Sequence, residues 1–136
     1  MNSTTFRGGT VLAQTGDKKH LHIICSEPAF YSGIGALGVL VVNITSVDPE
    51  RPYDATCVLH PGDYPFIEHD SYVLYAKAVV WKTSSIENRI LTGEIVTQPP
   101  LKEPVISNVI SGFLISPMTN RRILNFCRNN CIFSKS

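Results

Sequence analysis

The feature that most constrains this chain is an uncharged run from Val39 to Ser46. Its residues, Val-Leu-Val-Val-Asn-Ile-Thr-Ser, are mostly β-branched and carry no charge. β-Branched side chains favour extended backbone, and a continuous apolar run predicts a strand buried on both faces. We therefore expect this strand at the centre of a small sheet. Thr45 and Ser46 would emerge at its rim, where two adjacent hydroxyls either end the strand or belong to a site.

Four other segments predict shorter or more exposed strands around this centre. They are residues 10–13, 20–25, 56–59 and 71–81, and the last has the longest strand signal. In the second segment, period-two alternation places His20, His22 and Ile24 on one face. Residues 26–36 contain a proline and two glycines and predict a long loop. Five strands separated by turn residues at short spacing predict a small barrel.

Helical periodicity begins only after these strands. Pro104 fits the first position of a helix, and an apolar stripe runs on to Leu114 before Pro117 ends it. Thr119 is the expected N-cap of a second, shorter helix. Strands followed by helices predict an α+β fold. At 136 residues the chain is expected to form one domain, with a barrel over about 8–97, helices over about 103–128 and a tail over 129–136.

The net charge of +1 gives no global signature, but its distribution is uneven. From Pro117 onward there is no acid, and the cations are Arg121, Arg122, Arg128 and Lys135. Such an end contacts phosphate or an acidic partner, or is simply solvated. The start of the chain has neither the charged nor the apolar region of a signal peptide, and no stretch is suited to span a bilayer. We therefore expect a cytoplasmic protein without a membrane partner, and reduced cysteines.

The titratable candidates are four histidines, His20, His22, His60 and His69. An imidazole can act as general base or acid when a 2′-hydroxyl of RNA attacks its own phosphate, although a lone histidine is more often structural. The Cys57–His60 and Cys127–Cys131 spacings are weak zinc signals, because positions i and i+3 of a strand face opposite ways. We expect no metal and no cofactor. Phosphate-binding glycine loops, nucleophile elbows and HExxH are absent from the sequence.

Several segments in order resemble one known family. They are Gly9-Thr-Val-Leu, the segment from Lys18 to Ser26, the strand ending at Thr45-Ser46, and Ser71-Tyr-Val-Leu-Tyr-Ala-Lys-Ala-Val-Val. Together they resemble the MazF/PemK-type toxins, SH3-like barrels that are typically homodimeric, metal-independent endoribonucleases. The block from Gly62 to Val73 also resembles one found in uncharacterised bacterial and phage proteins.

The resemblance implies a function and a set of site residues. The function is metal-independent cleavage of single-stranded RNA, with an antitoxin or another protein as a further partner and a homodimer as the assembly. His20 or His69 would act as base or acid, and Thr45 and Ser46 would orient the scissile phosphate. Positive charge and further substrate contacts would come from Lys18, Lys19, Ser71 and Tyr72.

Two departures from the family pattern weaken the activity more than the fold. The arginine that these toxins use against the phosphate falls on His20, with Lys19 beside it, and the Gln-Ile-Arg end of the last strand is Ala76-Lys77-Ala78. An imidazole is a weaker and pH-dependent phosphate ligand than a bidentate guanidinium. The alternative hypothesis is therefore a non-catalytic SH3-like module that binds a protein or a nucleic acid. Its contact surfaces would be the loop at 26–38 and the basic end.

Overall fold

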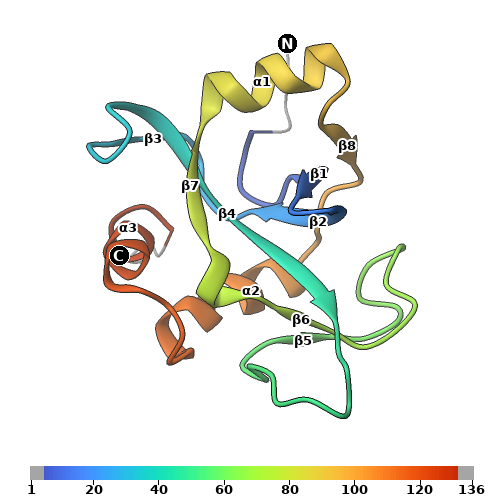
Figure 1. Cartoon of the computed structure of the whole chain (residues 1–136). Helices are drawn as coiled ribbons and strands as arrows, with labels where there is room; N and C mark the ends of the chain where they lie inside the picture. The colour runs from blue at the N-terminus through green and yellow to red at the C-terminus, as the bar shows by residue number, and fades with distance from the viewer. Residues whose placement is uncertain (1–4, 132–136) are drawn as a thin grey trace.

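A computed structural model describes residues 5–131. Within them the chain is α+β, as predicted, with three α-helices and an antiparallel sheet of eight strands (Figure 1). The strands are β1 (Thr10–Thr15), β2 (Lys18–Ile24), β3 (Ala29–Tyr31), β4 (Ala36–Ser46), β5 (Val58–Leu59), β6 (Ser71–Val73), β7 (Val79–Lys82) and β8 (Val96–Gln98). The helices are α1 (Thr83–Thr92), α2 (Val105–Ile115) and α3 (Arg121–Asn130).

Strand β4 is the centre of the sheet, which confirms the prediction from its β-branched sequence. It crosses the whole molecule in Figure 1 and pairs with strands along both of its edges. One edge pairs with β3 and then with β2, and the other pairs with β7 and then with β6. All of its residues from Gly38 to Ile44 are buried, as expected for a strand covered on both faces.

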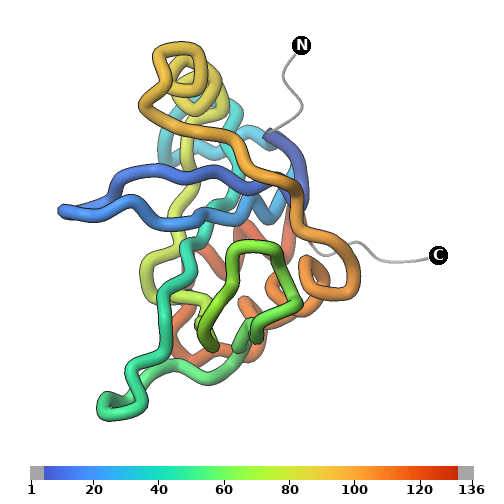
Figure 2. Tube along the Cα trace, turned by 90° about the vertical axis from the view of Figure 1, so that its right-hand side faces the viewer, coloured from blue at the N-terminus to red at the C-terminus, as the bar shows by residue number. Residues whose placement is uncertain are grey.

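The sheet is not closed into a barrel. Its strands follow the order β5-β6-β4-β2-β1-β8, with β3 and β7 as additional partners of β4, so the expected closed barrel of five or six strands is not observed. The pairing of β2 with β4 stops at His22 opposite Asn43, and the β1–β2 hairpin then leaves the sheet. Figure 2 shows this hairpin, in blue, projecting from the body of the molecule.

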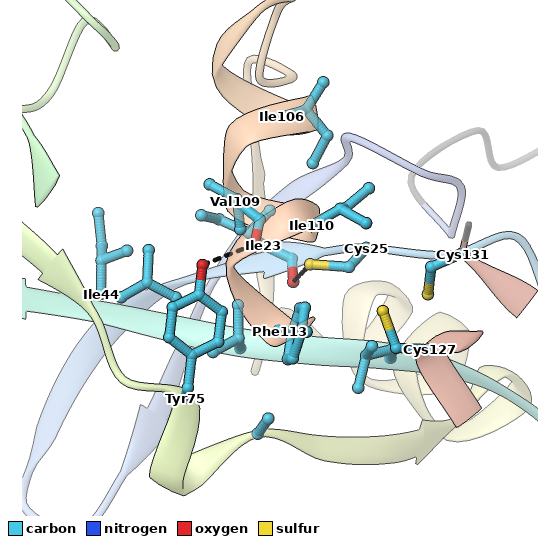
Figure 3. Packing of buried hydrophobic residues seen from close by; sticks show 14 of the residues in the cluster. Ile23, Cys25, Ile44, Tyr75, Ile106, Val109, Ile110, Phe113, Cys127 and Cys131 are labelled. Atoms are coloured by element: carbon cyan, nitrogen blue, oxygen red, sulfur yellow. Dashed lines mark hydrogen bonds between the residues drawn. The ribbon is translucent and has the colours of Figure 1, made fainter. Parts of the chain in front are cut away.

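The prediction of one strand over 71–81 is wrong. The segment forms β6, a 3₁₀ turn (η1, Tyr75–Lys77) and β7, which pair with different parts of β4. The cause is Tyr75, which is fully buried and donates a hydrogen bond of 2.6 Å to the carbonyl of Val109 on α2 (Figure 3). Its ring also packs edge-on against Phe113, with 4.8 Å between the ring centroids. A periodicity argument cannot detect this single anchored side chain.

Three elements were not predicted as such. Helix α1 occupies residues assigned to the barrel, and it was missed because its apolar face is narrow, with Ile86 as the buried residue. It ends at Gly93, whose φ of 85° suits glycine. Strand β8 follows and pairs with β1, and β3 lies in the predicted loop at 26–36, where Phe30 pairs with Leu37 of β4.

Helix α2 confirms the predicted apolar stripe as far as Phe113, but Leu114 is exposed and Pro104 is the N-cap rather than the first helical residue. In α2 the buried residues are Ile106, Val109, Ile110, Gly112 and Phe113. The N-cap of α3 is Asn120 rather than Thr119, because the Asn120 side chain accepts a hydrogen bond of 2.9 Å from the backbone N–H of Ile123. Helix α3 runs to Asn130, so the predicted tail at 129–136 begins in helix, and residues 132–136, with Lys135, lie outside the described residues.

The sheet packs on both faces, and the alternation predicted for β2 decides which residue joins which core. Ile23 and Cys25 pack in the larger core with α2 and α3, whereas Ile24 belongs to a smaller core with Ile86 of α1. All four cysteines are free thiols. Among the described residues, no helix has the length and apolarity needed to cross a membrane.

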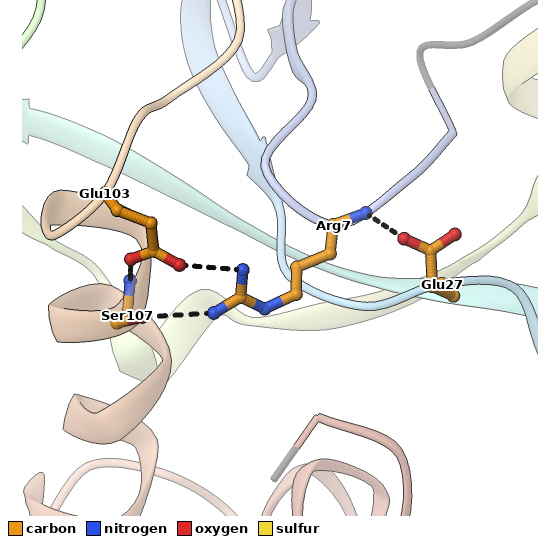
Figure 4. A network of polar contacts seen from close by, with 4 residues as sticks. All are labelled: Arg7, Glu27, Glu103 and Ser107. Carbon is orange, nitrogen blue, oxygen red and sulfur yellow. Dashed lines mark hydrogen bonds and ion pairs between the residues drawn. The ribbon is translucent and has the colours of Figure 1, made fainter. Parts of the chain in front are cut away.

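The segment before β1 is attached to the start of α2 by a polar network around Arg7 (Figure 4). The Arg7 guanidinium donates to the Glu103 carboxylate at 3.1 Å and to the Ser107 hydroxyl at 3.2 Å. The backbone N–H of Arg7 donates to Glu27 at 3.0 Å. These contacts connect the segment before β1 and the segment between β2 and β3 to the start of α2.

Candidate functional site

A surface hollow opens where β2 and β4 stop pairing. The last paired residues are His22 and Asn43, and beyond them the β1–β2 hairpin diverges from the end of β4. We call this space, of about 520 Å³, the hairpin hollow. Its lining residues are Leu12, Lys18, Lys19, His20, Leu21, Ile44, Thr45, Ser46, Phe66, Ile67, Ser71 and Gln98.

The hairpin hollow brings together most of the residues predicted as a site. Lys18, Lys19 and His20 come from β2, and Thr45 and Ser46 come from the end of β4. Ser71, the first residue of β6, is paired with Ser46 in the antiparallel register. Segments about 25 residues apart in sequence therefore place imidazole, ammonium and hydroxyl groups around one space.

His69 and Tyr72 do not line the hairpin hollow. His69 is exposed, and its carbonyl accepts a hydrogen bond of 3.0 Å from the Ser71 hydroxyl. Tyr72 packs against Tyr53, with 5.0 Å between the ring centroids, in a groove that Met118 also lines. Ser71 and Tyr72 therefore line different spaces, although they are neighbours in β6.

His60, like His69, does not line the hairpin hollow. His60 and Asp70 form an exposed ion pair with 2.8 Å between Nδ1 and the carboxylate. The hydrogen bond and the charge of Asp70 raise the pKa of His60. The pair fixes one loop against the next rather than facing the hollow.

The lining of the hairpin hollow suits an anion. It holds the side chains of Lys18 and Lys19 and contains no carboxylate, and its hydroxyls can donate hydrogen bonds. One imidazole without a carboxylate or thiol is a poor donor set for a divalent metal. In the described part of the chain, no three His, Cys, Asp or Glu side chains are grouped to hold an ion.

A second space was missed from the sequence. It has about 350 Å³, and we call it the histidine cavity. Its lining residues are Thr15, Gly16, His20, His22, Val41, Asn43, Leu74, Lys77, Val79 and Trp81. His20 lines both spaces, so the histidine cavity adjoins the hairpin hollow.

The ring of His22 has a defined tautomer. Its Nδ1 lies 2.9 Å from the His20 carbonyl, and a carbonyl only accepts, so Nδ1 carries the proton. Burial lowers the pKa of His22, which leaves the ring neutral and Nε2 with a free lone pair at neutral pH. The ring also lies against Trp81, with 4.9 Å between centroids.

The sequence contained part of the signal for this cavity. Alternation along β2 places His22 on the same face as His20, and the register of the structure then places Asn43 of β4 directly opposite His22. Lys77 and Trp81 join them only because the chain turns at η1. No protein-family model, curated protein or solved structure matches this chain. The two spaces are therefore the candidate sites of this chain.

Proposed function

We propose that this chain is a metal-independent endoribonuclease that cleaves single-stranded RNA at the hairpin hollow. The observation that supports this proposal is the convergence of His20, Thr45 and Ser46 with two lysines on one carboxylate-free surface. A phosphodiester needs positive charge and hydrogen-bond donors around its oxygens, and cleavage needs a base beside the 2′-hydroxyl. The hollow supplies all three kinds of group.

The proposed reaction is an internal transesterification. Neutral His20 takes the proton of the 2′-hydroxyl, and that oxygen attacks the adjacent phosphorus. Lys18, Lys19 and the hydroxyls of Thr45 and Ser46 stabilise the negative charge on the phosphoryl oxygens. The bond to the 5′-oxygen breaks, and the departing oxygen takes a proton from water. The products are a 2′,3′-cyclic phosphate and a 5′-hydroxyl, and the His20 imidazolium returns its proton to the solvent.

The relation to MazF/PemK-type toxins is part of the proposal. A central β4 that pairs with four strands is compatible with an opened SH3-like barrel. The same resemblance underlies the proposals of a homodimer and an antitoxin partner. Because His20 and Lys19 stand where the toxins have an arginine, we expect slower cleavage than a guanidinium would support.

The test is cleavage of an unstructured RNA by the purified chain in EDTA, analysed for cyclic phosphate ends. We expect His20→Ala and Thr45→Ala each to reduce the rate by about a hundredfold, the usual order for a general base or a charge-stabilising group. The matched control is His60→Ala, which removes an exposed imidazole outside the hollow. His69→Ala decides between the two predicted imidazoles, and we expect it to retain activity. Cleavage that persists in His20→Ala, or that requires a divalent ion, would refute the mechanism.

A second candidate function is non-catalytic binding of a protein partner. Phe30 and Leu37 form a cross-strand pair at the β3–β4 edge and are 66% and 55% exposed. The adjoining hollow is lined by Arg122 and Asn125 of α3. Sedimentation equilibrium of the wild type and of Phe30→Ser/Leu37→Ser tests whether this edge holds a homodimer. Loss of a dimer with unchanged RNA cleavage would assign the edge to assembly and leave catalysis to the hairpin hollow.

A further inference from the structure

The histidine cavity lies on the face of the sheet opposite α2, between β2, β4 and β7. Val41, Val79 and Leu74 give it apolar walls, and Trp81 adds a planar aromatic ring. Its volume of about 350 Å³ is within the range of roughly 300–1,000 Å³ that is typical of small-molecule sites. An apolar cavity of this size with a few polar groups is suited to a flat heterocycle.

Two polar side chains in the cavity are almost fully buried, and each has a polar atom without a hydrogen-bond partner. Asn43 is 8% exposed and His22 is 2% exposed. Among residues 5–131, no hydrogen bond reaches the Asn43 amide or the Nε2 atom of His22. In the described part of the chain, the only fully enclosed side-chain atoms without a partner are the hydroxyls of Thr83 and Thr119, which lie outside the cavity. The Asn43 amide and Nε2 of His22 are therefore accessible from the cavity. A ligand in the cavity can therefore form hydrogen bonds with both groups.

The free groups specify a hydrogen-bonding pattern. Asn43 offers one acceptor and an amino donor, and Nε2 of His22 offers a second acceptor. The ligand must therefore present two N–H hydrogens and an acceptor. Uracil has one ring N–H and can satisfy only one of the two acceptors. Adenine, cytosine and guanine each carry an exocyclic amino group, and an asparagine pairs well with such an edge.

We propose that the histidine cavity binds one amino-bearing nucleobase, adenine, cytosine or guanine, of the single-stranded RNA whose phosphate lies in the hairpin hollow. This inference rests on the proposed function for the identity of the polymer. His20 lines both spaces, so a base in one and the neighbouring phosphate in the other are separated by a single side chain. Lys77 is exposed and lines the cavity, so its ammonium group is available to a phosphate of the bound RNA. Cleavage would then depend on which base precedes or follows the scissile phosphate.

The test uses Trp81, the only tryptophan of the chain, as a reporter inside the cavity. Its fluorescence is followed while the protein is titrated with adenosine, cytidine, guanosine and uridine 5′-monophosphate. We expect saturable quenching by at least one amino-bearing nucleotide, with an affinity about tenfold or more above that of the uridine nucleotide. Asn43→Leu keeps the size of the side chain and should weaken that binding about tenfold. Asn88→Leu, on the exposed surface of α1, is the matched control and should bind as the wild type does.

A second measurement uses the wild type alone, so it does not depend on the folding of a variant. In ¹⁵N spectra, saturation with the preferred nucleotide should shift Nε2 of His22 and the side-chain amide of Asn43. Unchanged resonances, or equal affinity for the uridine nucleotide, would overturn the inference that the histidine cavity binds an amino-bearing base.

The two proposals fail separately. Nucleotide binding that depends on Asn43, without RNA cleavage, supports the base site and refutes the nuclease. RNA cleavage that is indifferent to base and to Asn43→Leu supports the nuclease and refutes the base site.

Discussion

The junction around Tyr75 and the hairpin hollow are both built on β4, yet they use it in opposite ways. At the junction Tyr75 is fully buried, donates a hydrogen bond to Val109 and packs on Phe113. At the hollow the strand pairing has ended, and Lys18, Lys19 and Ser46 are exposed. Stability is therefore concentrated at the junction, and polar groups free to bind a ligand are concentrated at the hollow.

The largest effect is expected from Gly112→Ala on α2. A Cβ there would overlap the Tyr75 hydroxyl oxygen, so the ring must move and its hydrogen bond to Val109 is lost. Overpacking costs about 1–3 kcal/mol and an unpaired buried group a similar amount, against about 1 kcal/mol gained in helix propensity. We expect a loss of about 2–4 kcal/mol in the free energy of unfolding, measured by urea denaturation. Ser111→Ala, one residue away and exposed, is the control and should leave stability within about 0.5 kcal/mol.

This junction also explains what the sequence could and could not predict. Periodicity identified β4, β2 and the apolar stripe of α2, because each depends on a repeating pattern of buried residues. It missed the break at η1, since one tyrosine anchored in the core overrides a run of strand-forming residues. It missed α1 because that helix buries little more than Ile86. The break at η1 and the position of α1 depend on tertiary contacts, which leave no repeating pattern in the local sequence.

The candidate site was predictable to a similar extent. Thr45 and Ser46 were located correctly at the rim, since the end of a buried strand must reach the surface. The position of His20 beside Thr45 and Ser46 followed only from the resemblance, because the sequences of β2 and β4 do not determine the register in which they pair. Asn43 was treated as part of a buried run, and its free amide became visible only with the cavity beside it.

The next largest effect is expected from Tyr75→Phe, which keeps the packing and removes one hydroxyl. The Val109 carbonyl would lose the donor at 2.6 Å, although helix geometry still offers it a partner. We expect a loss of about 1–2 kcal/mol in the free energy of unfolding. Tyr53→Phe, at a half-exposed ring, should change it by less than about 0.5 kcal/mol. Equal losses in both variants would contradict the special role of the junction.

A smaller effect, which depends on pH, is expected from His22. Burial lowers its pKa in the folded chain below the ordinary value of 6.5, so the unfolded chain binds the proton more readily. Above pH 6.5 both states are neutral, and the free energy of unfolding falls as the pH drops below that value, by up to about 1.4 kcal/mol per pH unit. His22→Gln should flatten this slope in urea denaturation between pH 7 and pH 5.

His60 provides a control with the opposite sign. Its pKa is raised by Asp70, so its contribution to stability is present below pH 6.5 and is lost as the pH rises through its folded pKa. His60→Ala should therefore leave the acid-side loss attributed to His22 in place. If His60→Ala, and not His22→Gln, removed that loss, the assignment of a buried neutral ring at the histidine cavity would be wrong.

The smallest effect on stability is expected where binding should suffer most. Lys18 and Lys19 extend from the end of the hairpin into solvent, so their replacement by alanine removes no packing and should change the free energy of unfolding by less than about 0.5 kcal/mol. Each lysine that contacts phosphate should contribute about 0.7 to the slope of log affinity against log salt for a single strand, so the double variant should lower that slope by about 1.4. Lys102→Ala, exposed before α2 and outside the hollow, should leave it unchanged. If the double variant lost stability but kept the salt slope, the two lysines would contribute to folding rather than to phosphate binding. That result would contradict the assignment of ligand binding to the hairpin hollow.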